Sequence, residues 1–512
     1  MQASRPAHGS RGADRGPAAA RPAAAARRPR RRRAAGPVAA LQEPSPQPAP
    51  APPALNLPDG RQPWWNVLKQ LSRPAAYFSD VLKGRDAAVG QFGVFHDTAF
   101  IGSPALAREL LGSEERSGIN VGWGPALVQL VGERSVSMVA DPEEHARQRA
   151  LLMPFFSPDV VAAKMPAIQA TARRYLAEWV SSPAPFSAYD GMKRFTFDVL
   201  VNQVLELSLD DAEVTEMSRT FQAWARGFLP PAVDVPFTPF GQGMAARNKI
   251  RDKILSLLAA GRLPPDGLVA RLQSHFGGDT EAIIDNIINV QFAGHDTSSS
   301  SLTSMLGALA ANPRVLARLA DEQAAVVAAH GEALTPAAVA AAPYAAAVVR
   351  ETLRMRLIVP GVMRKAEKDV QLAGGLSIPK GCPVLVAFSA IADREPAWEA
   401  DRGEFRPERF LTGGSGGSGG PEALAPQPAG FNPFGIGTRY CLGSHLALAE
   451  MGAMVAELGR LAGSHALEVE QPGRWEEFPI LRPDNGLPTR FVAKPPGAAG
   501  RAPERELLSA QA

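Results

Sequence analysis

Two cysteines are the only thiols in this chain of 512 residues, and their surroundings differ. So few cysteines form no disulfide framework, which is typical of a reducing compartment. Cys382 follows the stretch 379–381 (PKG) and has no donor or ligand residue beside it, so we interpret it as a small buried apolar side chain. Cys441 lies in the segment 434–443, FGIGTRYCLG, whose composition allows chemistry.

The residues around Cys441 meet the needs of a thiolate that binds a metal. Gly435 and Gly437 permit a tight backbone whose successive N–H groups can point at sulfur. The stretch 442–455 is helix-like, and the N-terminus of a helix favours a negatively charged sulfur. Cys441 is therefore the candidate metal ligand.

An aromatic and a cationic side chain complete this segment. Phe434 can shield the ligand from water, and Arg439 can donate charge-assisted hydrogen bonds to a carboxylate. With Gly437, Cys441 and Gly443 they form the pattern Phe-x-x-Gly-x-Arg-x-Cys-x-Gly, which resembles the haem-binding loop of the cytochromes P450. The resemblance implies a bound haem b, Cys441 as the axial ligand of its iron, and cofactor contacts from Phe434, Gly435, Arg439, Cys441 and Gly443.

A long helix is predicted over residues 279–311, because isoleucines at 283, 284, 287 and 288 share one side with Phe292. Its length of about 33 residues corresponds to roughly 50 Å, which is enough to cross a domain. Near its middle, residues 293–297 (AGHDT) resemble the oxygen-activating motif of the same family. The resemblance implies that Ala293 and Gly294 lie against the haem and that Gly294 leaves room for dioxygen.

The acid and the alcohol of this motif are the predicted catalytic residues. A hydroxyl next to a carboxylate can deliver protons through ordered water, which assigns this role to Asp296 and Thr297. Thr297 can also bond back to a helix carbonyl and distort the helix locally. We interpret His295 as structural or solvent-facing, because the family varies at this position.

Two further groups of charged residues follow the order of the family's motifs. Glu351 and Arg354 share a face of the helix predicted over 343–356, and Arg409 lies in the later segment 407–410 (PERF). The resemblance implies that these three residues form a buried structural triad. Haem propionates need cationic partners. The resemblance assigns this role to His145 and Arg149, four residues apart on a predicted helix, to Arg364, and to Arg439.

The expected fold is mainly α with a small β region, a single large P450 domain over residues 63–495. Further predicted helices cover 142–153 and 159–180, a hairpin covers 91–103, and short strands cover 369–388 around the turn at 379–381. One departure from the family stands at 393–396 (DREP), where Asp393 replaces a histidine. A glycine- and serine-rich insertion at 413–420 is interpreted as a flexible loop.

Residues 1–62 and 496–512 are expected to be disordered. The first 35 residues hold ten arginines and one acidic residue, which is typical of a transit peptide, and a proline-rich linker follows. A disordered basic arm and a nuclear-localisation-like run remain alternatives. If the segment is a transit peptide, we expect an organelle, a chloroplast rather than a mitochondrion; otherwise we expect a soluble cytoplasmic protein.

Charge and hydropathy limit the kinds of binding partner that we expect for this protein. Outside the first 35 residues, 44 basic residues face 50 acidic ones, so we do not expect nucleic-acid binding. No apolar stretch of about 18 residues is present, so no transmembrane anchor is expected. The resemblance implies an oxidoreductase, expected as a monomer, that binds dioxygen and a lipophilic substrate: a terpenoid, carotenoid, retinoid, sterol or fatty acid. Electrons would come from NAD(P)H through a separate ferredoxin or flavoprotein reductase.

Two alternatives belong to other classes of function. A P450 that rearranges hydroperoxides needs no reductase, but such members typically lack the acid–alcohol pair or carry a longer cysteine loop. A haem sensor or carrier needs no proton-delivery residues, and Asp296 and Thr297 argue against it. The sequence does not identify the substrate, the redox partner or the organelle.

Overall fold

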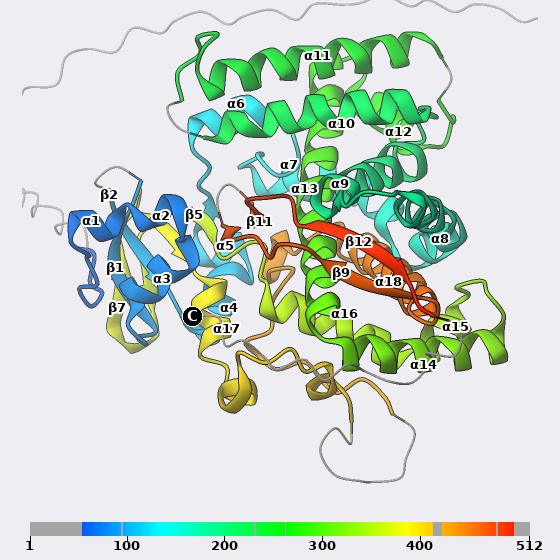
Figure 1. Ribbon diagram of the computed structural model, residues 1–512. Helices are drawn as coiled ribbons and strands as arrows, with labels where there is room; N and C mark the ends of the chain where they lie inside the picture. The colour runs from blue at the N-terminus through cyan, green and yellow to red at the C-terminus, as the bar shows by residue number, and fades with distance from the viewer. Residues whose placement is uncertain are drawn as a thin grey trace, which may run out of the picture. The chain divides into compact units, whose positions relative to one another are not determined.

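A single long helix, α13 (Thr280–Ala311), organises the fold. Its first turn is capped by the side chain of Asp279, which accepts a hydrogen bond from the N–H of Ala282 at 3.2 Å. Helix α13 packs against α9, α18, α12 and α16, and Figure 1 shows it running between these helices. The sequence prediction of this helix is correct to within one residue.

The computed structural model describes residues 54–93, 96–229, 232–261, 263–412, 422–477 and 480–495, which belong to the compact unit Pro52–Ala512. The other α-helices are α1 (Trp64–Val67), α2 (Lys69–Ser72), α3 (Pro74–Leu82), α4 (Pro104–Leu111), α5 (Glu114–Ser117), α6 (Pro125–Val131), α7 (Pro142–Leu152), α8 (Pro158–Ser181), α9 (Ala188–Asp198), α10 (Asp211–Ala225), α11 (Pro239–Ala259), α12 (Leu268–Phe276), α14 (Pro313–His330), α15 (Pro336–Ala340), α16 (Pro343–Met355), α17 (Phe388–Asp393) and α18 (Ser444–Leu461). Short helical turns of other types are η1 (Met153–Phe156), the π-helix η2 (Val199–Val204), η3 (Arg226–Phe228), η4 (Ala373–Gly375), η5 (Pro396–Asp401), η6 (Pro407–Phe410) and η7 (Gly437–Arg439).

The strands form one larger sheet and three small ones. The five-stranded sheet has the order β1 (Ala87–Phe92), β2 (His96–Ile101), β8 (Pro383–Val386), β5 (Val362–Ala366) and β3 (Ile119–Val121), and only β2 and β8 pair in parallel. Helix α3 packs on its β1 and β2 side (Figure 1). The small sheets are β4 (Phe186–Ser187) with β12 (Pro488–Ala493) and β9 (His465–Val469), β6 (Val370–Leu372) with β7 (Leu376–Ile378), and β10 (Trp475–Glu476) with β11 (Arg482–Pro483).

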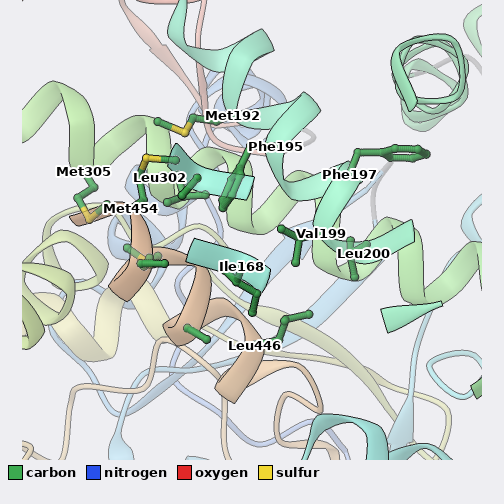
Figure 2. Close-up of a cluster of buried hydrophobic side chains, with 14 of the residues drawn as sticks. Ile168, Met192, Phe195, Phe197, Val199, Leu200, Leu302, Met305, Leu446 and Met454 are labelled. Atoms are coloured by element: carbon green, nitrogen blue, oxygen red, sulfur yellow. The ribbon is translucent and has the colours of Figure 1, made fainter. Parts of the chain in front are cut away.

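The main hydrophobic core lies where α8, α9, η2, α13 and α18 meet (Figure 2). Its members come from segments far apart in the sequence, and the apolar faces of these helices supply fully buried side chains. Close packing here fixes the position of α18 relative to α13. The labelled residues of Figure 2 are Ile168, Met192, Phe195, Phe197, Val199, Leu200, Leu302, Met305, Leu446 and Met454.

The described elements agree with most of the sequence predictions. Helices α7, α8 and α16 match the predicted ranges within two residues, and a hairpin forms, although β1 begins at Ala87 instead of 91. Packing starts before the expected boundary at Pro63, because the N–H of Asn56 bonds to Ser377 and that of Gly60 to Val89, at 3.0 and 2.8 Å. Residues 1–53, 413–420 and 496–512 lie outside the described residues.

Helix length and hydropathy bear on membrane spanning. Among the described residues, no single helix is both long and apolar enough to cross a membrane. One pair of helical segments bent by 45°, Pro142–Phe156 with Pro158–Ser181, satisfies the same length and composition criteria jointly.

Candidate functional site

The Cys441 loop is shaped by two glycines. Gly435 and Gly437 have φ angles of 74° and 79°, a region that L side chains rarely adopt. A side chain at Gly437 would also collide with the backbone oxygen of Leu111, which lies 1.8 Å from the position of a Cβ atom. The loop closes through a hydrogen bond of 3.0 Å from the N–H of Cys441 to the oxygen of Phe434.

The Cys441 thiol faces a space inside the protein. Its residue is exposed, yet burial raises the pKa of the thiol, so surrounding atoms crowd it without covering it. The backbone N–H of Gly443 and the charge of Arg149 act in the opposite direction and favour the thiolate. This arrangement presents sulfur on the wall of a hollow, with donors positioned to stabilise its charge.

Four nitrogen-bearing side chains predicted to bind propionates gather beside this loop. Burial lowers the pKa of His145, and the nearby cations Arg439, Arg149 and Arg364 contribute to its value of about 4, against an opposing effect of Glu114. In the absence of a bound anion, His145 is therefore a neutral imidazole near pH 7. Burial also lowers the pKa of Arg364 to about 10, with Arg439 adding to the effect.

Among the described residues, Glu114 is the acid that opposes this group of cations, and no sequence pattern had indicated it. Its carboxylate pairs with Arg439, which also donates to the backbone oxygen of Val139 at 2.9 Å. The Nη1 atom of Arg439 is buried without a partner, and Arg364 donates only to the backbone oxygen of Met363, at 2.8 Å, within the described part of the chain. Buried cations without counter-charges are costly, so this cluster is suited to an anionic ligand.

On the other side, α13 presents Ala293 and Thr297 to a hollow. Ala293 is exposed although it lies in the middle of a buried helix, and Thr297 is half-buried. The Thr297 hydroxyl donates to the carbonyl of Ala293 at 2.6 Å, the bond expected from the sequence. Gly294 has a different role from the expected one: a Cβ there would meet the side chain of Leu200 at 2.9 Å, so glycine allows α13 to approach η2.

Asp296 points to α9 and forms a buried ion pair. Its Oδ1 lies 2.9 Å from Nζ of Lys193, and both side chains are 8% exposed. Burial raises the pKa of Asp296, but Lys193 and His295 outweigh this effect and bring it below its usual value. His295 is fully buried beside Thr196, with 3.1 Å between its Nδ1 and the threonine hydroxyl, so its structural interpretation holds and the solvent-facing one is wrong.

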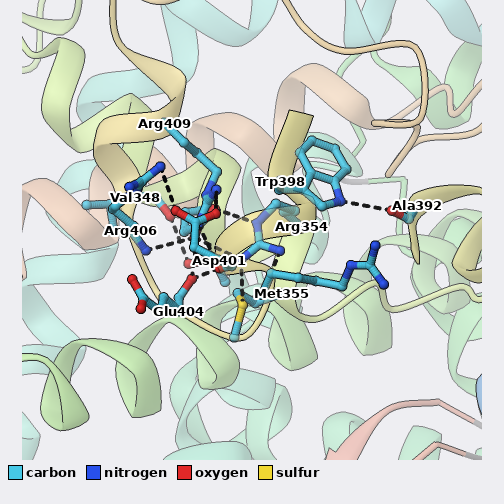
Figure 3. Close-up of polar contacts among 12 residues, drawn as sticks. Val348, Arg354, Met355, Ala392, Trp398, Asp401, Glu404, Arg406 and Arg409 are labelled. Carbon is cyan, nitrogen blue, oxygen red and sulfur yellow. Dashed lines mark hydrogen bonds and ion pairs between the residues drawn. The ribbon is translucent and has the colours of Figure 1, made fainter. Parts of the chain in front are cut away.

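The predicted structural triad is assembled, and Figure 3 shows its two arginines, Arg354 and Arg409, among the polar contacts of this region. Glu351, which is completely buried, accepts from Nε and Nη2 of Arg354 at 2.7 and 2.9 Å and from Nε of Arg409 at 3.1 Å. The N–H of Arg406 adds a further bond to Glu351 at 2.8 Å. Arg354 also donates to the carbonyls of residues 402 and 404.

Aromatic contacts connect this triad to the cysteine loop. Phe410, next to Arg409, packs on Phe431 with 5.2 Å between ring centroids, and Phe431 leads into the loop. The segment that departs from the family at Asp393 contributes too, because Glu395 accepts the N–H of Gly430 at 2.7 Å. The position of Cys441 therefore depends on residues up to ninety positions earlier in the chain.

The comparisons with known proteins agree with this geometry. The family model for cytochrome P450 matches residues 58–458. The chain belongs to the cytochrome P450 family. Abscisic acid 8'-hydroxylase 1 of Arabidopsis thaliana is 31% identical over 69% of this chain and 72% of its own length. Cytochrome P450 26A1 of Gallus gallus is 26% identical over 78% of this chain and 84% of its own.

A solved structure shows the same fold. The structure of retinoic acid bound cyanobacterial CYP120A1 superposes with a TM-score of 0.73 at 24% identity and covers 86% of this chain and all of that one. The chain is therefore a monooxygenase of the P450 fold, mainly helical with small sheets, from a family that binds haem iron through a cysteine thiolate.

The residues of this P450 fit a haem. Cys441 supplies a thiol at the wall of a hollow, and Arg149, Arg364 and the unpartnered Nη1 of Arg439 supply buried positive charge beside it. Two propionates are the anions that a haem would bring to this charge.

Sequence reasoning missed three functional or buried charged residues. No sequence spacing links Glu114 to its partner Arg439, or Lys193 to its partner Asp296. Glu450 stands in the apolar stretch of α18, which was a visible signal. It is completely buried, and within the described residues neither carboxylate oxygen has a hydrogen bond of normal geometry. Burial raises the pKa of Glu450 to about 8, against a lesser effect of Ser298, so this acid is neutral at pH 7.

Proposed function

We propose that this P450 uses a haem b held by Cys441 to hydroxylate or epoxidise a lipophilic substrate, with dioxygen and with electrons from NAD(P)H that a separate protein delivers. The observation that carries the proposal is the accessible Cys441 beside a cluster of buried cations, together with the accessible Ala293 and the half-buried Thr297 in the middle of α13. A bound haem would supply the oxygen activation, and thiolate ligation favours cleavage of the O–O bond.

The residues around Cys441 would hold the cofactor. Phe434 and the backbone of Gly435 and Gly443 would enclose the sulfur, and the N–H of Gly443 favours its charge. His145 would donate a hydrogen bond as a neutral imidazole, and Arg149, Arg364 and Arg439 would neutralise the propionates. Glu114 orients Arg439 so that Nη1 stays free for this contact.

On the oxygen side, Thr297 would hold and release a proton. Its hydroxyl already donates to Ala293, so its oxygen can accept a hydrogen bond from water while its own proton is held. Asp296 would supply protons to Thr297 through water, and its ion pair with Lys193 keeps it ionised between deliveries. Proton delivery then depends on the movement of Asp296 away from Lys193.

The relatives and the aromatic residues beside Ala293 support the substrate class. Abscisic acid, the substrate that the Arabidopsis relative is named for, is an isoprenoid acid. Phe292, one residue before Ala293, packs against Trp224 and Phe228 with 5.0 Å between each pair of ring centroids, so an apolar aromatic cluster adjoins the accessible Ala293. An isoprenoid of the size of a sesquiterpenoid or retinoid is the substrate we propose.

The test is turnover driven by an electron donor. The haem-loaded enzyme, a ferredoxin with its reductase, NADPH and labelled dioxygen are incubated with terpenoids and retinoids, and product and peroxide are measured. We expect labelled hydroxylated or epoxidised product, and we expect Thr297→Ala to lower it by about 100-fold or more while NADPH oxidation continues. Ser301→Ala, which removes a hydroxyl bonded to the Thr297 carbonyl at 3.0 Å, is the control.

Two results would contradict the proposal. Product formation that needs no electron donor would indicate a hydroperoxide-rearranging enzyme. A Thr297→Ala enzyme with the product yield of the Ser301→Ala control would remove Thr297 from the proton path.

A further inference from the structure

Arg356 is the one guanidinium at the end of α16 that lacks a polar partner. Arg354 bonds to Glu351, and Arg350 donates to the carbonyl of Ala425 at 2.8 Å. Within the described residues, the side chain of Arg356 makes neither a hydrogen bond nor an ion pair; its contact is with the ring of Trp475, whose centroid lies 4.9 Å from the guanidinium carbon.

The surroundings of Arg356 combine a desolvated charge with accessible surface. Burial lowers the pKa of Arg356, with an opposing effect of Glu477, while the residue remains exposed, so neighbouring atoms crowd the guanidinium without covering it. Glu477 does not neutralise it by contact: its Oε2 accepts the N–H of Ala75 at 2.8 Å. Burial also raises the pKa of Glu477, which weakens its value as a counter-charge. A positive charge that is partly stripped of water and stacked on an indole is suited to a planar anion.

Two connections place Arg356 at the edge of the proposed substrate space. The apolar segment 357–363 joins Arg356 to Arg364, which belongs to the cationic cluster, and Val359 in this segment is 38% exposed. Trp475 belongs to the hairpin β10–β11, where Glu476 pairs with Arg482.

The charge of this hairpin also acts on the oxygen-side helix. Burial raises the pKa of Asp296, and Lys193, His295 and then Arg482 lower it. The segment 357–363 thus connects Arg356 with the cationic cluster, and the hairpin that holds Trp475 contributes charge on the oxygen side.

We infer that Arg356, stacked on Trp475, binds the carboxylate of the substrate, and that the substrate is an isoprenoid carboxylic acid. The inference rests on the proposed function and names the substrate class more narrowly. The guanidinium fork matches both carboxylate oxygens, and the apolar segment 357–363 would lie along the hydrocarbon part. Esters and alcohols of the same skeleton would leave the charge of Arg356 unpaired and would bind more weakly.

The test compares an acid with its ester. Binding of abscisic acid, of retinoic acid and of their methyl esters to the haem-loaded enzyme is measured by equilibrium dialysis and by difference spectra. We expect at least one acid to bind about 10-fold or more tightly than its ester, because a charge-assisted pair is lost in the ester. Arg356→Gln should reduce this ratio to near one, and Arg356→Lys should keep part of it. Arg350→Gln, on the same helix, is the control and should keep the full ratio.

The outcomes separate the inference from the function on which it rests. Equal binding of acid and ester, or an unchanged ratio in Arg356→Gln, would overturn the role of Arg356 and leave the monooxygenase proposal intact. Electron-driven turnover of neutral terpenoids alone would overturn the acid as substrate class. Absence of donor-driven product from every isoprenoid, with the acid and its ester both unbound, would contradict the proposed function itself.

Discussion

The Glu351 triad and the His145–Arg149–Arg364–Arg439 cluster are both buried and charged, yet they are built differently. In the triad, each described polar atom of Glu351 has partners at 2.7–3.1 Å, and two arginines share one acid and several carbonyls. In the cluster, among the described residues, Glu114 alone opposes three arginines and Nη1 of Arg439 has no partner. A network whose charges are all paired stabilises the fold, whereas a network with unpaired cations is suited to bind an anionic ligand.

The largest expected effect is the loss of the acid from the completed network. Glu351→Gln leaves Arg354 and Arg409 buried without a counter-charge, so it should lower the free energy of unfolding by about 3–5 kcal/mol. Denaturant unfolding measures this change. Glu468→Gln removes an exposed pair with Arg490 and should change the free energy of unfolding far less. Equal losses in the two variants would show that the triad is no stronger than a surface pair.

The buried acid Glu450 forms no ion pair within the described residues, and it should make the stability of the protein depend on pH. The folded-state pKa of Glu450 is about 8, above its value in the unfolded chain, so its stabilising contribution is complete at acidic pH and is lost as the pH rises through about 8. As the pH rises from the ordinary pKa of a glutamate toward about 8, the free energy of unfolding should fall by about 1.4 kcal/mol per pH unit. Glu450→Gln should flatten the profile. An unchanged profile in this variant would mean that Glu450 is ionised in the folded state.

The smallest effect on folding is expected in the incomplete cluster. Arg364→Met removes one of the mutually repelling cations, so the protein without haem should lose no stability, while release of haem should become about 10-fold faster because a propionate loses a charge-assisted bond. Transfer of haem to an acceptor protein measures the release. Lys365→Met, the exposed neighbour on β5, is the control. A destabilised protein with normal haem release would mean that Arg364 is a structural residue like Arg354.

The sequence predicted what local spacing encodes. The apolar period of residues 283–292 placed α13, the glycines around Cys441 placed its loop, and the order of the motifs gave the fold. Partners that meet only through tertiary packing were not predictable: Lys193 reaches Asp296 across 103 positions, and Glu114 reaches Arg439 across 325. Protonation was not predictable either, because the neutral state of His145 depends on burial and on three surrounding arginines.

The central claim is that Cys441 is the iron ligand of a haem-thiolate site. The most direct measurement is the spectrum of the reduced, carbon-monoxide-bound protein, compared for the wild type, Cys441→Ser and Cys382→Ser. The account predicts a thiolate-type Soret shift in the wild type and in Cys382→Ser, whose thiol is buried and bonded to the carbonyl of Pro383. Cys441→Ser should lose both this shift and activity. Retention of both by Cys441→Ser would contradict the account.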